Sequence, residues 1–328
     1  MIPEYHYRVR DDSLLTPIFK KWVVTPLFRI IPWWLPANII TIVSNILMYV
    51  ALYLAMPESP ADRSVRFIFI SLLILGYTIG DHFDGMQAKR TGTSSALGEL
   101  CDHFLDIFNN GIMVYIICLS FHITNPSLIA FFLVSGYLPH AATFYEQFST
   151  KWLYFEKIGA LESVLMFIAL ILLSTIEPVY RFMVSSSFFS NLKIVELAFI
   201  ALSTGAYFTF VKVVKRARIA DIWFWVFCAL LISVASMATT FLSPAEVFYL
   251  ITAYSAIYIG NLQRGHLADG KIRFPDVTVP LILASYFAFG CQQESLQLFY
   301  VYIALRVIYI AGNAFWTLRR FWVWKNPK

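Results

Sequence analysis

The chain has 328 residues, of which 59% are apolar and only 14% are charged, and its formal net charge is +5. Soluble domains carry about a quarter of charged residues, so this composition excludes an ordinary soluble domain and indicates that lipid surrounds most of the chain. The modest charge gives no reason to expect a nucleic acid partner. The cysteines lie in apolar stretches at unrelated spacings, which favours packed residues over a disulfide framework or a zinc site; they are Cys101, Cys118, Cys228 and Cys291.

The N-terminal region is polar up to residue 12 and lacks the apolar core of a secretory signal. Apolar and basic residues then alternate at helical spacing over residues 13–31, and Pro17 and Pro26 interrupt this pattern. The alternation predicts an amphipathic helix in the membrane interface, followed by an aromatic anchor at Trp33 and Trp34. A soluble helix packed on the membrane domain is the alternative interpretation.

Ten apolar segments follow, with short connections and no visible internal repeat, which weakens the case for an inverted-repeat transporter. The sequence therefore predicts an all-α integral membrane protein with about ten transmembrane helices and an N-terminal interfacial helix. The segments run roughly over residues 38–56, 66–83, 97–121, 126–147, 159–176, 192–212, 219–240, 245–263, 275–291 and 295–318.

Basic residues alternate from one connection to the next. Most of the 25 lysines and arginines fall on the side of the N-terminus, and only Arg63, Arg66, Arg181 and Lys193 fall on the other. Cytoplasmic loops carry the excess of basic residues in membrane proteins. The pattern therefore predicts that both termini lie in the cytoplasm. Arg306 stands alone inside the last apolar segment, and the sequence assigns it no partner.

Four aspartates occur where the second and third segments meet, namely Asp81, Asp84, Asp102 and Asp106. A charged residue at the centre of a spanning helix costs about 3 kcal/mol or more, so four of them require a compensating charge. The first two are three residues apart and the last two are four apart, so each pair shares one helix face. Two helices joined by a short turn can aim both pairs at one point. An all-oxygen shell suits Mg²⁺ or Mn²⁺, and four carboxylates suit two such ions.

Other residues near the aspartates fit a phosphate-bearing substrate. Gly85 allows a ligand to approach the backbone, and Gly98 leaves space on the face of Asp102. Lys89 and Arg90 stand at the predicted cytoplasmic mouth, where they can meet phosphate oxygens. The same carboxylates are also compatible with the pore or proton relay of a cation or metal transporter, and spacing alone does not decide between the two.

The aspartate region resembles the signature of the CDP-alcohol phosphotransferases, in which four aspartates recur with fixed glycine and Ala-Arg positions between them. The residues that match this signature are Asp81, Asp84, Gly85, Ala88, Gly98, Asp102 and Asp106. The one departure is Lys89, which stands where the family has arginine; Arg90 follows directly, and we expect it to take over the phosphate contact. Residues 98–100 and 102–103, with residues 36–41, resemble the choline/ethanolamine phosphotransferase branch. The likeness covers roughly residues 10–170.

The resemblance implies roles for individual residues. Asp81, Asp84 and Asp102 would be metal ligands, and Asp106 would be both a ligand and the base that faces the acceptor hydroxyl. Because a metal-bound carboxylate is a weak base, the pair His103 and Glu162 would relay the proton. The expected nucleotide-binding residues are Asn38, Thr41, Gly85, Ala88, Lys89, Arg90 and Gly98.

The predicted reaction transfers phosphocholine or phosphoethanolamine from CDP-choline or CDP-ethanolamine to a lipid alcohol and releases CMP. Diacylglycerol is the expected acceptor and ceramide the alternative. The competing hypotheses are a CDP-diacylglycerol-dependent phosphatidyltransferase and a metal or cation transporter. Residues 1–37 would be the cytoplasmic N-terminus, 38–213 the catalytic core and 214–328 the C-terminal helices. The active site would face the cytoplasm from a bacterial inner membrane, the endoplasmic reticulum or the Golgi. A homodimer is left open.

Overall fold

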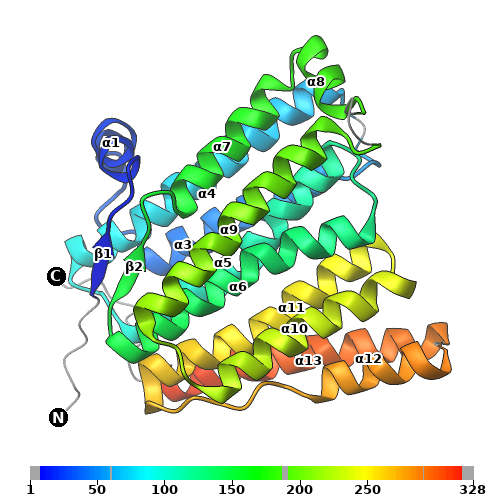
Figure 1. The fold of residues 1–328 in the computed structure, drawn as a ribbon. Helices are drawn as coiled ribbons and strands as arrows, with labels where there is room; N and C mark the ends of the chain where they lie inside the picture. Colours follow the sequence, from blue (N-terminus) through cyan, green and yellow to red (C-terminus); the bar gives the residue numbers. More distant parts are fainter. Residues whose placement is uncertain (1–7, 60, 187–190, 291, 320–328) are drawn as a thin grey trace.

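The computed structural model describes residues 8–59, 61–186, 191–290 and 292–319 (Figure 1). Cys291 lies outside the described residues. Within them the chain is almost entirely helical, which confirms the predicted all-α class. The two named strands in this part of the chain are three residues long: β1 (Val9–Asp11) pairs in parallel with β2 (Leu153–Phe155), with Val9 opposite Leu153.

The amphipathic segment before the bundle is helical, as predicted. It consists of α1 (Thr16–Phe19), the π-helical turn η1 (Lys20–Val24) and α2 (Thr25–Phe28). Phe19 and Val24 are buried in one apolar cluster with Phe83, whereas Trp22 and Ile18 are 71% and 56% exposed. One face therefore packs on the bundle while the other presents apolar side chains outward, as expected for a helix at a membrane interface.

Each of the ten predicted segments contains a helix. Among the described residues, seven helices are long and apolar enough to cross a membrane, and α7 with α8, bent by 114°, makes an eighth candidate; the count of ten is therefore approximate. The helices are α3 (Ala37–Ala55), α4 (Arg63–Thr91), α5 (Ala96–Ser120), α6 (Pro126–Thr150), α7 (Ala160–Leu173), α8 (Glu177–Val184), α9 (Ile194–Ala217), α10 (Ile222–Phe241), α11 (Pro244–Arg264) with its π-helical extension η2 (Gly265–Asp269), α12 (Thr278–Phe289) and α13 (Gln293–Leu318).

The helices at the centre of the bundle are α5 and α6 (Figure 1). Their apolar windows are 67% and 61% buried, against 22% for α9 and α13. Helix α11 packs against both of them, and Gly260 allows the close contact, because a Cβ there would lie 2.6 Å from the Phe104 ring. The outer helices expose their apolar side chains, which is the pattern of a bundle solvated by lipid.

One end of the bundle carries β1 and β2, and α8 lies at the other end (Figure 1). At the first end, the Arg216 guanidinium donates two 2.6 Å hydrogen bonds to the Glu146 carboxylate. Lys212 and Arg216 also donate hydrogen bonds to the Glu156 carboxylate. Although burial opposes it, these cations lower the pKa of Glu156 below its usual range. Connections predicted to share one side of the membrane therefore meet at one end of the molecule.

Candidate active site

Helix α4 reaches the site because it packs unusually closely on α3. A Cβ at Gly80 would lie 2.6 Å from the Cβ of Ser44, so only glycine fits this crossing. The helix continues to Thr91 and ends at Gly92, whose φ of 65° is left-handed. The sequence-based helix end near residue 83 is therefore too early, and Asp81 and Asp84 lie inside α4.

Helix α5 begins beside the end of α4. Ser95 caps it by accepting a 3.1 Å hydrogen bond from the Gly98 backbone N–H. A Cβ at Gly98 would lie 3.3 Å from Ser95 Oγ and 3.5 Å from Asn38 Oδ1. Ser95 and Asn38 therefore occupy the surroundings of Gly98, where the sequence predicted open space. This contact brings one expected nucleotide-binding residue next to another, from helices more than fifty residues apart in sequence.

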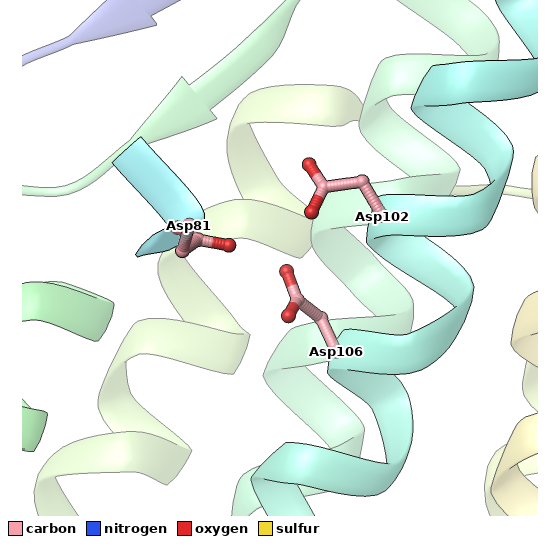
Figure 2. Close-up of side chains that lie close together, drawn as sticks. All are labelled: Asp81, Asp102 and Asp106. Carbon is pink, nitrogen blue, oxygen red and sulfur yellow. The ribbon is translucent and has the colours of Figure 1, made fainter. Parts of the chain in front are cut away.

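Asp81, Asp102 and Asp106 converge (Figure 2). One carboxylate oxygen from each of the three lies within 4.8 Å of the others, and all three side chains are half-buried. No ion pair between the described residues joins a lysine or arginine to this triad; His82 Nδ1 lies 3.9 Å from Asp81 Oδ2. Three negative charges so close together repel one another strongly unless a cation joins them.

Asp84, the fourth aspartate of the motif, is not among the three converging carboxylates, and α3 holds one of its oxygens. It is 6% exposed, and its Oδ2 accepts a 2.6 Å hydrogen bond from Thr41 Oγ1. Thr41 therefore contacts a predicted metal ligand directly, while its expected role was in nucleotide binding. Three of the four aspartates form the cluster, and the fourth is held against α3.

Three polar residues that the sequence reasoning missed hold this arrangement. Tyr77 OH donates a 2.7 Å hydrogen bond to Asp106 Oδ1. Asn109 Nδ2 donates to Asn45 Oδ1 at 2.6 Å, and Asn45 Nδ2 donates to the Thr41 carbonyl at 2.7 Å. Each is a polar residue within an apolar helix, and Asn109 follows Asp106 by three residues on the same face. A polar residue in an apolar helix, on the same face as an aspartate of the motif, was the signal in the sequence that could have identified Asn109 as part of the site.

His103 is buried beside the site on a different face of α5. Its Nδ1 lies 3.8 Å from Glu99 Oε1, and its ring packs on Phe144 with centroids 5.2 Å apart. Gln147 Nε2 donates a 2.7 Å hydrogen bond to that same Glu99 oxygen. A carboxylate fixed from α6 therefore faces the imidazole.

Glu162 has different neighbours from His103. One carboxylate oxygen accepts from Ser13 Oγ at 2.6 Å and from the Leu15 N–H at 2.9 Å, and the other accepts from the Gly159 N–H at 2.8 Å. The residue closes the N-terminus of α7 and ties the amphipathic segment to it. The contacts described for Glu162 do not include His103, so the predicted relay between the two stays a prediction.

The adjacent cations Lys89 and Arg90 are placed differently. Arg90 donates to the Ile31 carbonyl at 2.9 Å, and its guanidinium lies 4.4 Å from the centre of the Phe28 ring. Lys89 is exposed, and a Cβ at Gly85 would meet nothing within 4 Å. The Ala88 carbonyl accepts from the Thr93 N–H at 2.9 Å in the turn after α4. Lys89 thus stands at the position of the family arginine with its side chain open to a ligand.

The donor set fits a hard divalent cation. It consists of carboxylate oxygens, the ligands that Mg²⁺ and Mn²⁺ prefer, and the triad includes no sulfur or imidazole. The convergence of like charges, with Asp106 fixed by Tyr77, is the arrangement expected of ligands held ready for a cation. The site can therefore bind a divalent metal next to a position open to phosphate oxygens.

Comparison with known proteins agrees with this geometry. The family described as CDP-alcohol phosphatidyltransferase matches residues 34–189, which include all four aspartates. Choline/ethanolaminephosphotransferase 1 of Arabidopsis thaliana is 38% identical over 109 residues, covering 31% of this chain and 27% of the relative. Its namesake in Saccharomyces cerevisiae is 32% identical over 121 residues, covering 35% and 30%.

Other relatives extend the match. Cholinephosphotransferase 1 of Gallus gallus is 28% identical over 181 residues, covering 53% of each protein. An uncharacterized CDP-alcohol phosphatidyltransferase class-I family protein of Dictyostelium discoideum is 30% identical over 152 residues, covering 45% of this chain and 37% of the relative. The chain thus spans about a quarter to a half of the length of the curated relatives it matches.

Proposed function

We propose, from the match of residues 34–189 to the CDP-alcohol phosphatidyltransferase family, that the chain transfers phosphocholine or phosphoethanolamine from its CDP ester to a lipid alcohol. Diacylglycerol is the proposed acceptor, with ceramide as the alternative, and CMP is the other product. The observation that carries the proposal is the convergence of Asp81, Asp102 and Asp106 inside the matched region, because these three carboxylates lie close enough together to hold a metal ion, one helical turn from the open space at Gly85.

In the proposed reaction the acceptor hydroxyl attacks the β-phosphorus of the CDP ester. A bond forms between that oxygen and phosphorus, the bond from phosphorus to the bridging oxygen breaks, and CMP leaves with the bond electrons. The four aspartates would hold a pair of Mg²⁺ or Mn²⁺ ions, and these ions would supply positive charge against the negative charge on the pyrophosphate.

Each remaining role in the proposed reaction is assigned to a side chain of this protein. Asp81, Asp84, Asp102 and Asp106 would hold the cations, and Asp106 is kept in place by Tyr77. Lys89 meets phosphate oxygens as a point charge. Asn38 lies against Gly98, and both would contact the nucleotide. The hydroxyl proton passes to Asp106, or to His103 from the neighbouring face of α5.

The proposal includes the orientation of the site. Most basic residues fall on the side of the membrane that carries the N-terminus and Lys89, and cytoplasmic sides carry this excess. We therefore place the aspartates toward the cytoplasm, where water-soluble CDP esters are available. The outward apolar face of α1 to α2 would lie in the same leaflet, next to the lipid acceptor.

The test is a substrate panel with the purified protein in lipid. CDP-choline, CDP-ethanolamine and CDP-diacylglycerol are each offered with diacylglycerol, ceramide and small polar alcohols, and CMP is measured. CMP release that requires a CDP-aminoalcohol and a lipid alcohol supports the proposal. CMP release only from CDP-diacylglycerol with a small alcohol would instead identify the protein as a CDP-diacylglycerol-dependent phosphatidyltransferase. Metal uptake into vesicles without nucleotide turnover would assign a transporter.

A further inference from the structure

A buried glutamine, Gln87, joins α4 to the turn that precedes α3. Its side chain is 0% exposed. Its Nε2 donates hydrogen bonds to the backbone carbonyls of Pro32, Trp33 and Leu35, at 3.1, 3.3 and 2.6 Å. Because three carbonyl oxygens face the same end of the side chain, that end is the amide nitrogen. Gln87 therefore fixes the backbone of a whole turn.

The start of α3 depends on this support. Helix α3 begins at Ala37, and among the described residues no side chain caps its first turn at Pro36. The carbonyls of Trp33 and Leu35 lie before the first helical residue, where the hydrogen bonds of the helix do not use them. Backbone carbonyls in an apolar environment require a donor. Gln87 supplies that donor from the neighbouring helix.

Gln87 is the last of three contacts along one face of α4. Gly80 lies against Ser44, and Asp84 accepts the hydrogen bond from Thr41. Gln87 follows Asp84 by three residues and therefore shares its face. The matching contacts on α3 run in the opposite direction, from Ser44 through Thr41 to the turn before the helix. Gln87 thus sets where the first turn of α3 lies along α4.

Asn38 belongs to that first turn. Its Oδ1 would lie 3.5 Å from a Cβ at Gly98, at the start of α5. Thr41, on the next turn of α3, keeps its own hydrogen bond to Asp84. Loss of the Gln87 amide would therefore release Asn38 before it released Thr41. We propose that Gln87 is a positioning residue that holds Asn38 against Gly98 for the nucleotide part of the CDP ester. This inference rests on the proposed transferase function.

Kinetics of Gln87→Met test the proposal, because methionine keeps the length of the side chain and removes the amide. KM for the CDP ester should rise roughly tenfold, since several hydrogen bonds are lost together. The metal requirement and kcat should stay close to wild type. General damage to the fold would not produce this split. The matched control is Gln263→Met, which removes a glutamine of α11 that is 2% exposed and should leave KM unchanged.

Hydrogen exchange of the same variants tests the anchor without any activity. The peptide that covers residues 31–41 should exchange roughly tenfold faster in Gln87→Met, and at the wild-type rate in Gln263→Met. If Gln87→Met fails to fold, Gln87→Asn takes its place, because its amide is one methylene shorter and cannot span the same carbonyls.

Three results would overturn the proposal: wild-type exchange of residues 31–41 in the Gln87 variant, an unchanged KM for the CDP ester, or an equal rise in the metal requirement. Absence of CMP release by the wild type would instead count against the proposed transferase function. An active Gln87 variant with the wild-type KM counts against the role of Gln87 alone.

Discussion

Thr41 Oγ1 donates a 2.6 Å hydrogen bond to Asp84 Oδ2, and this contact links α3 to the aspartate motif of α4. Asn45 and Asn109 continue the connection from the Thr41 carbonyl toward α5. A single polar chain across three helices therefore supports both Asp84 and the region of Asp106. Thr41 acts on the site by positioning a carboxylate.

This relationship predicts the effect of Thr41→Val, which keeps the shape of the side chain and removes its hydroxyl. We expect the concentration of Mg²⁺ or Mn²⁺ for half-maximal activity to rise roughly tenfold or more, the usual effect of losing a partner of a metal ligand. KM for the CDP ester should change little at saturating metal. Thr41→Ser, which retains the hydroxyl, is the matched control. An unchanged metal requirement with a raised nucleotide KM would return Thr41 to the nucleotide site expected from the sequence.

A second prediction ranks Lys89→Ala and Arg90→Ala by their effects on KM for the CDP ester. Because Arg90 is engaged by the Ile31 carbonyl and the Phe28 ring while Lys89 is exposed, Lys89→Ala should raise KM for the CDP ester roughly tenfold. Arg90→Ala should instead lower the melting temperature by loosening the amphipathic segment. This order reverses the sequence-based expectation. Steady-state kinetics and thermal unfolding of the two variants decide, and a larger KM change in Arg90→Ala would restore the original assignment.

A third prediction distinguishes the role of His103 from that of Glu162. His103→Ala should lower kcat by about 10²–10⁴-fold if the imidazole takes the hydroxyl proton. Glu162→Ala should mainly lower the melting temperature, because its carboxylate holds Ser13, Leu15 and the start of α7. A large kcat loss in Glu162→Ala that is not additive with His103→Ala would instead support the relay, since residues that act as a unit give non-additive losses.

Much of the fold was predictable because apolar runs mark membrane helices directly. The end of α4 was missed for a physical reason: residues 81–91 are polar because they line a site, and a hydropathy pattern reads such residues as a helix end. The meeting of Asp81 with Asp102 and Asp106 was also predictable, since helical spacing fixes which residues share a face.

Side-chain partners from distant helices were not predictable from the pattern. The engagement of Asp84 by Thr41 depends on how closely α3 approaches α4, which Gly80 decides. Arg306 appeared unpaired in the sequence, yet its Nε donates a 2.8 Å hydrogen bond to Asp276 Oδ2. Asp276 lies thirty residues earlier, in a connection whose path no local periodicity describes.

The orientation of the bundle is tested by labelling single cysteines with a membrane-impermeant thiol reagent. Lys215→Cys should react only from the cytoplasmic side and Arg181→Cys only from the other, because the basic residues of the two sets of connections differ so strongly in number. A variant with the native cysteines replaced is the background. Reaction of both positions from the same side would reject the topology and the cytoplasmic placement of the site.

The central claim is that the aspartate cluster holds the divalent cations on which transfer of the CDP ester depends. The most direct measurement is CMP release by the purified protein from CDP-choline or CDP-ethanolamine with diacylglycerol, before and after chelation and in Asp102→Asn. We expect chelation to abolish release, added Mg²⁺ or Mn²⁺ to restore it, and Asp102→Asn to remain folded but inactive at any metal concentration. Full CMP release in excess chelator, or wild-type turnover by Asp102→Asn, would contradict the account.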